Sequence, residues 1–258
     1  PIDIKTKKTI PKISDPKFDK NLVLENLEKN ILSNWETWGK FQQAWTNRAY
    51  RVFKDLDKYI VLIYLIRNYW QGLSDKFQYL SMDEFYEYDK ITIDKINLIE
   101  ISNELNIPKE TIRRKVNFLQ DQNIIFRKGK AIYFSNAINK MQRPANSKKM
   151  MSNFLEKTSH ILTKESWFGR AFSKEEIESF IDKYFTICWQ HWFRLQIPFL
   201  VRHRTFFGDL ETWNVWGAIG ISQFTDYSKQ VRERVVEDPR TYADLYLHLL
   251  RHTPKNGI

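Results

Sequence analysis

The sequence predicts a mainly helical protein in which a small α+β element is flanked by two similar helical segments. Large apolar residues recur at helical spacing in residues 21–80 and again in 173–252. Between them, residues 96–134 change to short helical and strand patterns. The length of 258 residues and the 42% hydrophobic content are sufficient for a folded core and exclude a disordered chain.

The charge balance makes an anionic partner the first to consider. Lys and Arg number 41 against 31 Asp and Glu, a net charge of +10, which is typical of proteins that bind nucleic acid or an anionic surface. The single cysteine, Cys188, excludes an internal disulfide, and we expect it to be a small buried residue in a reducing cytoplasm. The N-terminus lacks a secretory pattern, and the longest apolar run, Tyr59 to Ile66, is too short for a bilayer. We therefore expect a cytoplasmic protein.

Residues 1–20 predict a flexible basic arm, and residues 21–90 a first helical segment. One amphipathic helix would carry six apolar residues on one face, and a second would cover about 57–69. Ser81 and Glu84 form a capping-box pattern that predicts a short helix. The six residues are Leu22, Leu24, Leu27, Ile31, Trp35 and Trp38.

Residues 91–136 have the layout of a winged helix-turn-helix. The pattern predicts a strand at 96–98, a helix at 99–105 that buries Ile101 and Leu105, and a turn at Asn106 and Ile107. Pro108 would open a second helix that ends at Asn123. That helix would bury three residues at i, i+4 and i+7, and strands at 124–126 and 131–134 would flank a tip at 127–130, in which Gly129 supplies a positive φ. The three buried residues are Ile112, Val116 and Leu119.

Positive charge is concentrated on this second helix and its hairpin. Residues 109–130 contain seven basic and two acidic side chains, a net charge of +5. The pattern I-P-K-E-T-I-R-R-K-V-x-x-L followed by a hairpin resembles the winged helix-turn-helix domains of bacterial transcription regulators. The resemblance covers residues 96–134 and implies that the second helix reads the DNA major groove while the wing contacts the backbone or minor groove. It assigns base reading to Lys109, Thr111, Arg113, Arg114 and Asn117, and wing contacts to Arg127, Lys128 and Lys130.

A basic linker is predicted at 137–152 and a second helical segment at 153–258. Ser173 and Glu176 form another capping box, which would open one long helix through Trp192, and Pro198 would end or kink it. Further helices are expected at about 209–223 and 241–252.

The two helical segments align without gaps at an offset of 154 residues. Positions 35 to 61 hold eight identities in 27, where chance gives about two. We interpret this as an internal duplication, although the choice of the best offset could also produce it. Pro108 shifted by 154 falls beyond Ile258, so either only the helices are duplicated or a second winged helix follows. The eight pairs are Trp35/Trp189, Trp38/Trp192, Gln42/Gln196, Arg48/Arg202, Phe53/Phe207, Asp55/Asp209, Leu56/Leu210 and Val61/Val215.

Aromatic residues at helical spacing indicate core and inter-helix packing. A second interpretation is an aromatic-lined pocket for a small-molecule effector, or a dimer seam, that includes Gln42, Gln196, Arg48 and Arg202 as buried polar groups. If single helices continue, Arg48 would pair with Asp55 and Arg202 with Asp209.

Catalytic and metal-binding motifs are absent from the sequence. His191 and His203 lie near Asp209 and Glu211 without a metal-ligand spacing, and the eight glycines form no phosphate-binding loop. We expect no enzymatic activity, cofactor or metal.

The function predicted from the sequence is that of a sequence-specific transcription regulator that binds double-stranded DNA, as a homodimer if its target is palindromic. The alternative is a winged-helix protein-interaction or architectural module without base readout.

Overall fold

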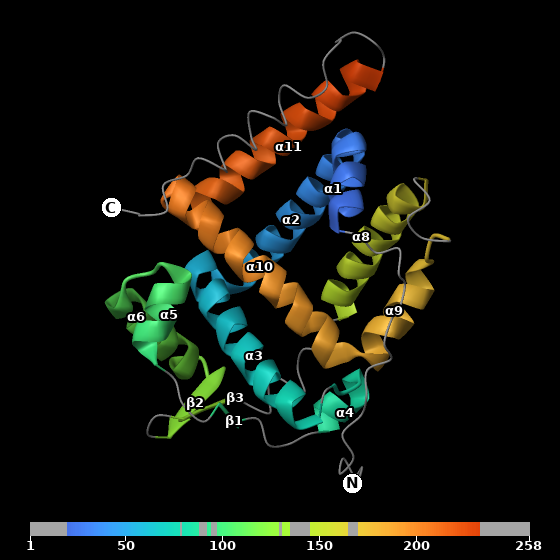
Figure 1. Cartoon of the computed structure of the whole chain (residues 1–258). Helices are drawn as coiled ribbons and strands as arrows, with labels where there is room; N and C mark the ends of the chain where they lie inside the picture. The colour runs from blue at the N-terminus through green and yellow to red at the C-terminus, as the bar shows by residue number, and fades with distance from the viewer. Residues whose placement is uncertain are drawn as a thin grey trace. The chain divides into compact units, whose positions relative to one another are not determined.

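The computed structural model describes residues 20–77, 79–87, 92–93, 97–128, 131–134, 145–164 and 170–232, and within these ranges the protein is mainly helical, as predicted (Figure 1). The first elements are α1 (Lys20–Lys29), α2 (Ile31–Phe53), α3 (Leu56–Phe77) and α4 (Met82–Glu87). The middle of the chain forms β1 (Thr92–Ile93), α5 (Leu98–Leu105), α6 (Lys109–Asp121), β2 (Ile125–Lys128) and β3 (Ala131–Phe134). The last elements are α8 (Ala145–Lys164), α9 (Lys174–Lys183), α10 (Phe185–Phe207) and α11 (Leu210–Arg232).

The described residues form two compact units. The first comprises those within 53–148 and 178–201, and the second those within 20–52, 149–177 and 202–232. The first unit therefore contains α3 and most of α10, whereas the second contains α2 and α11. Each unit takes helices from both of the segments that the sequence alignment pairs.

Aromatic packing holds the first unit together. The ring of Trp70 on α3 stacks on Phe193 of α10 with centroids 5.2 Å apart, and Phe85 of α4 lies 5.2 Å from Phe185. The N–H of Leu80 donates to the hydroxyl of Thr186 at 2.8 Å. Since these residues are buried, the hydrophobic effect and this satisfied polar pair fix α10 beside α3.

The second unit combines aromatic stacking with a network of amide side chains. Phe41 of α2 stacks on Phe154 of α8 at 4.5 Å. The Oδ1 atom of Asn214 on α11 accepts from Gln43 Nε2 at 3.0 Å and from the Thr46 hydroxyl at 2.7 Å. A Cβ atom at Gly217 would lie 2.9 Å from Gln43 Oε1, so the glycine leaves room for the Gln43 side chain in this network.

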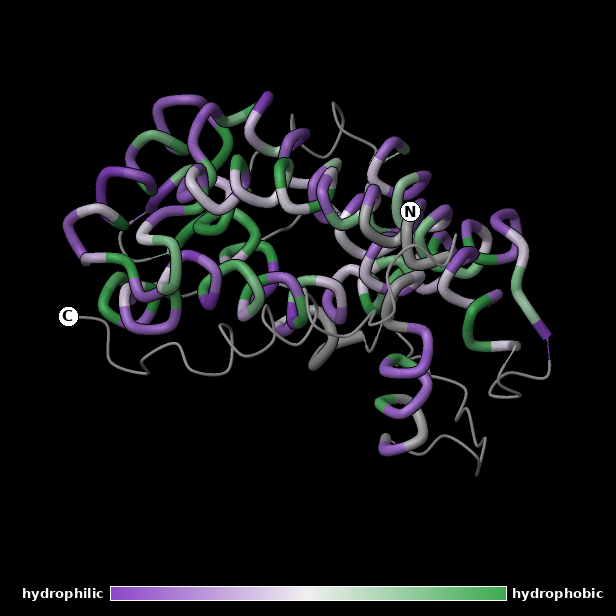
Figure 2. Tube along the Cα trace, turned by 90° about the horizontal axis from the view of Figure 1, so that it is seen from above, coloured by the Kyte–Doolittle hydropathy of each residue, from purple (hydrophilic) through white to green (hydrophobic). Residues whose placement is uncertain are grey.

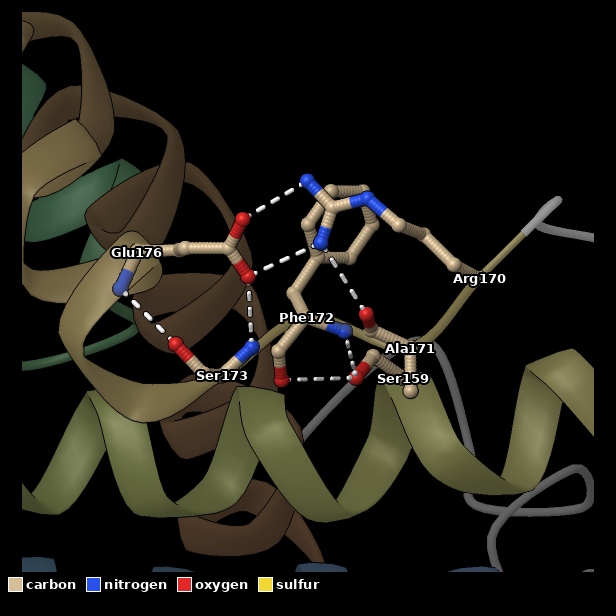
Figure 3. A network of polar contacts seen from close by, with 6 residues as sticks. All are labelled: Ser159, Arg170, Ala171, Phe172, Ser173 and Glu176. Carbon is tan, nitrogen blue, oxygen red and sulfur yellow. Dashed lines mark hydrogen bonds and ion pairs between the residues drawn. The ribbon is translucent and has the colours of Figure 1, made fainter.

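Both predicted capping boxes are confirmed. At α4, Ser81 N–H donates to Glu84 at 2.9 Å and Glu84 N–H donates to the Ser81 hydroxyl at 3.3 Å. At α9, Ser173 N–H and the guanidinium of Arg170 both donate to the carboxylate of Glu176 (Figure 3). Together these hydrogen bonds lower the pKa of Glu176 to about 2.

Three helix predictions were wrong in their extent. The face from Leu22 to Trp38 belongs to two helices, because α1 ends before Asn30, and Leu24 is 55% exposed. The helix from Ser173 likewise divides at Tyr184. The N–H groups of Asn30 and Tyr184 still donate to residues four positions earlier, so the helical period hides both breaks. Helix α10 does not end at Pro198 but continues to Phe207. Pro198 and Arg194, whose carbonyl loses its hydrogen bond, are both exposed, so water can solvate that carbonyl.

Other helices exceed their predicted length. Helix α3 extends to Phe77 and α11 to Arg232. Helix α8 begins at Ala145, so the second half of the predicted linker at 137–152 is helical, with Met151 and Ser152 buried. The basic arm at 1–20, apart from Lys20, and the helix at 241–252 lie outside the described residues. Hydrophobic and hydrophilic residues are mixed along the helices (Figure 2). Among the helices that the structure describes, none is long and apolar enough to cross a membrane.

The helix bounds repeat at the offset at which the sequence repeats. Adding 154 to the bounds of α1 and α2 gives those of α9 and α10, and adding it to α3 gives α11 to within one residue. Helices α3 and α11 are each preceded by an aspartate cap, and the residue before that cap has a positive φ, 52° at Lys54 and 85° at Gly208. Asp55 then accepts from Lys58 N–H at 3.0 Å, and Asp209 from Thr212 N–H at 2.6 Å.

These aspartates replace the ion pairs expected from the sequence. Helices α2 and α10 end at Phe53 and Phe207, ahead of Asp55 and Asp209. The single continuous helix that would align Arg48 with Asp55, and Arg202 with Asp209, is therefore absent in both places. The aspartates cap the next helices instead.

Candidate nucleic-acid interface

Helices α5 and α6 pack against each other and against α3, and an antiparallel sheet of order β1-β3-β2 follows beside them (Figure 1). The predicted core is confirmed, since Ile101, Leu105 and three residues of α6 are 0–2% exposed. Ile107 N–H donates to the Ser102 carbonyl at 3.1 Å, which closes the turn between the helices. These contacts place α6 with one face buried and the other exposed. The three α6 residues are Ile112, Val116 and Leu119.

The predicted strand at 96–98 was wrong. Asn97 is the N-cap of α5, where its side chain accepts from Ile99 N–H at 3.0 Å, and Leu98 is the first helical residue. The strand that pairs with β3 is β1, through Thr92 with Tyr133 and Ile93 with Ile132. An asparagine cap competes with strand formation because its side chain satisfies a helix N–H group.

The end of α6 agrees with the prediction for Asn123. This residue has a φ of 54°, the left-handed conformation that asparagine tolerates. Its N–H donates to the Gln120 carbonyl at 2.9 Å, and Ile124 N–H reaches back to Leu119 at 2.9 Å. The chain therefore turns directly from α6 into β2. Pro108 lies just before the first residue of α6.

The structure brings five predicted reader residues together on α6. Lys109, Arg113, Arg114 and Asn117 are exposed, and Thr111 is partly exposed. Arg113, Arg114 and Asn117 fall within about 100° of the helix circumference, opposite the buried stripe. On β2, Arg127 and Lys128 are exposed, whereas Lys130 lies outside the described residues.

The guanidinium groups of Arg113 and Arg114 each form a hydrogen bond with a residue three positions earlier on α6. Glu110 accepts from Arg113 at 2.6 Å and 3.0 Å, and this hydrogen bond and charge raise the pKa of Arg113. Arg114 donates to the Thr111 hydroxyl at 3.3 Å. Arg113 is therefore paired with a carboxylate, whereas Arg114 is bonded to a neutral hydroxyl.

Lys115 does not belong to the exposed cluster. It forms an ion pair with Asp55 at the start of α3, and its side chain is 20% exposed. Beside it, the ammonium of Lys58 lies 3.6 Å from the centre of the Phe118 ring. These contacts join α6 to α3. Of the seven basic residues predicted to form a cluster at 109–130, Lys115 therefore contacts α3 instead of solvent.

Acidic residues mark the outer side of α5. Glu100 is exposed, and Glu104 pairs with Arg67 of α3 at 2.8 Å. These charges would repel phosphate, whereas α6 and β2 present exposed cations. In the region formed by α5, α6 and β2, the exposed positive charge therefore lies on α6 and β2, and exposed negative charge lies on α5.

His203 and Cys188, two potentially reactive side chains named in the sequence analysis, lie on α10. His203 is buried and its ring lies 4.9 Å from that of Trp213. Within the ranges that the structure describes, no three His, Cys, Asp or Glu side chains are grouped to hold a metal ion. Burial raises the pKa of the Cys188 thiol to about 12, which keeps it protonated.

Two of the four polar residues that the sequence analysis expected to be buried are exposed. Gln42 and Gln196 are buried, but Arg48 and Arg202 are exposed. A cavity of about 440 Å³ in the second unit is lined by the aromatic rings of Phe41 and Phe154, and otherwise by smaller, aliphatic and polar side chains that include Lys40 and Lys157.

Comparisons of this chain with protein-family models, curated protein sequences and solved structures found no match.

Proposed function

We propose that the protein is a sequence-specific DNA-binding transcription regulator that uses a winged helix-turn-helix formed by α3, β1, α5, α6, β2 and β3. The observation that carries this proposal is the exposed group of Arg113, Arg114 and Asn117 on a helix whose opposite face is fully buried. A helix of this kind fits the major groove of B-DNA.

Each exposed side chain suits a distinct contact. Arg113 and Arg114 present guanidinium groups, which bind guanine edges and phosphates in a bidentate manner, and Asn117 presents an amide, which pairs with adenine. Arg127 and Lys128 at the end of β2, with Lys130 after them, supply cations for phosphates. Lys109 and Thr111 lie at the start of α6, the end that enters the groove.

A second candidate, a protein-interaction module, is favoured by a different observation. Ile99 on α5 is 52% exposed and Phe126 on β2 is 46% exposed. Exposed large apolar residues are common at protein interfaces. Such a module would bind its partner through these two side chains without reading bases.

Selection of genomic DNA fragments by the full chain, followed by titration of the enriched sequence, tests the proposal. We expect Arg113→Ala with Arg114→Ala to lose discrimination between the selected and a scrambled duplex, about 1–3 kcal/mol for each base pair that is no longer read. Arg48→Ala with Arg51→Ala removes two exposed arginines from α2 and serves as the matched control. Equal discrimination by both double variants would refute base reading by α6. In that case Ile99→Ser and Phe126→Ser test the second candidate.

Dimerisation on a palindromic target and binding of an effector remain predictions from the sequence. The cavity beside Phe41 is where we propose that an effector would bind. Sedimentation of the protein with and without DNA tests the dimer.

A further inference from the structure

One acidic side chain lies within the exposed face of α6 that carries the proposed DNA-reading residues. At about 100° per residue, Glu110 falls in angle between Asn117 and Arg114, so it lies inside the arc that these residues define. It is exposed and is the second residue of the helix, in the part of a recognition helix that contacts base edges. Asp121, the other acidic residue of α6, lies about 17 Å further along the helix axis. Of the two acids, Glu110 is the one placed to reach a base.

This carboxylate is unfavourable for general binding to the DNA backbone, because it repels phosphate groups. Stability of the fold does not explain it. The side chains of Arg113 and Glu110, which form an ion pair, are 59% and 63% exposed, and exposed pairs of this kind contribute little to folding. The helix dipole favours an acid in the first turn, but it does not select the side of the helix that faces DNA. A contact with DNA accounts for the position of the carboxylate on that side.

The hydrogen bonds of Glu110 use one of its two carboxylate oxygens. Oε1 accepts from Nε of Arg113 at 3.0 Å and from Nη2 at 2.6 Å. Oε2 accepts no hydrogen bond from the residues that the structure describes. Arg113 keeps the two N–H groups of Nη1 as donors. The pair therefore presents a free acceptor and free donors next to each other on the exposed face.

A G·C base pair has the complementary groups at its major-groove edge. Cytosine N4 is an amino donor, which a carboxylate accepts, and guanine O6 and N7 are acceptors for a guanidinium. Adenine also has an amino donor, but its N7 acceptor lies beside it, and thymine presents the O4 acceptor. Both acceptors would repel a carboxylate, so cytosine is the base that an acid on this face favours.

We propose that Glu110 is a specificity-determining residue of α6, which accepts from the N4 amino group of a cytosine in the target DNA and holds Arg113 toward the guanine of a G·C pair. The inference rests on the proposed function, since it requires α6 to lie in the major groove. The carboxylate lowers the affinity for every DNA sequence, but it lowers it least where a cytosine is present. It therefore acts by disfavouring the wrong bases.

Parallel selection of genomic DNA fragments by the unaltered chain and by Glu110→Gln tests the inference. A glutamine amide pairs with adenine, so the selected base should change from cytosine to adenine at one position of the target. In titrations of duplexes that differ only at that base pair, the unaltered chain should prefer cytosine by at least about fivefold. Glu110→Gln should prefer adenine, and Glu110→Ala should bind both duplexes alike.

The matched control is Glu100→Ala, because Glu100 is also an exposed acid in the first turn of its helix, α5. This variant removes the same charge, so it should change the affinity for both duplexes by an equal factor and leave the cytosine preference intact. Circular dichroism should show equal helix content in all three variants, since both glutamates are exposed.

Retention of the cytosine preference by Glu110→Ala, or its loss in Glu100→Ala as well, would overturn the inference. If the unaltered chain selects a sequence that Arg113→Ala with Arg114→Ala no longer selects, while both Glu110 variants still select it, this inference alone fails. If the unaltered chain selects no sequence, the proposed function fails and this inference fails with it.

Discussion

The salt dependence of DNA binding gives a quantitative test of the exposed charge on α6 and β2. Five cations are exposed there in the described residues, while Lys115 is held by Asp55. If each of the five neutralises one phosphate, log Kobs should fall with log salt at a slope of about −4.5, or about 500-fold between 50 and 200 mM. The five are Lys109, Arg113, Arg114, Arg127 and Lys128.

Arg113→Ala with Arg114→Ala should reduce the slope to about −2.7, or about 40-fold over the same range. The control Arg48→Ala with Arg51→Ala lowers the net charge equally but should leave the slope near −4.5. Fluorescence anisotropy of a labelled 30-base-pair duplex, measured over a series of KCl concentrations, gives both slopes. Equal slopes for the two double variants would show that the α6 arginines neutralise no phosphate, and the count of five phosphate contacts would then be wrong.

Three further predictions follow from local contacts. Asp209→Ala should destabilise the second unit by about 1 kcal/mol through loss of the α11 cap. Asp55→Ala should cost more, because it also removes the carboxylate that pairs with Lys115, and Asp55→Asn should cost less than Asp55→Ala if it keeps the cap. Urea unfolding gives the order, and equal losses for Asp209→Ala and Asp55→Ala would contradict it. Cys188 is partly exposed, but burial raises the pKa of its thiol from 9.0 to about 12, so it should react with a thiol reagent at pH 8 more slowly in the folded than in the unfolded protein, and comparable rates would contradict the raised pKa. Glu176, whose pKa falls from 4.5 to about 2, contributes stability that is present above pH 4.5 and lost as pH drops toward 2; Glu176→Gln should flatten this loss, and a carboxyl NMR titration near 4.5 would disprove the pKa shift.

The helix-turn-helix core was predictable because its determinants are local. The spacing of Ile112, Val116 and Leu119 defines the buried face of α6, and Asn123 supplies the left-handed turn that follows. By contrast, β1 has only two residues, too few for a periodic signal. Its pairing with β3 joins Thr92 to Tyr133 and Ile93 to Ile132, residues far apart in the sequence.

The role of Lys115 could not be predicted, because its partner lies 60 residues earlier. In the sequence it looks like one more base in the cluster beside Arg113 and Arg114. A weak signal exists, since Lys115 comes three residues after Ile112 and so borders the buried stripe. Only the position of α3 decides whether a residue at that border faces a partner helix or the solvent.

The two segments aligned at the offset of 154 residues agree in their helix bounds but differ in their core contacts. In the second unit Gln43 bonds Asn214, a polar contact between α2 and α11. The positions 154 residues apart are Ile197 on α10 and Ile60 on α3, and both are buried and apolar. The change is matched on both helices, because an amide facing an isoleucine would leave a buried polar group unpaired.

The caps, in contrast, are the same in both segments. Asp55 and Asp209 each accept a backbone N–H, and Leu56 and Leu210 after them are both fully buried. A cap involves only neighbouring residues, so it is maintained whichever helix packs nearby. Matching helix bounds with dissimilar cores are therefore what a duplication with later divergence predicts, because the ends of helices depend on local chemistry and their faces on partners.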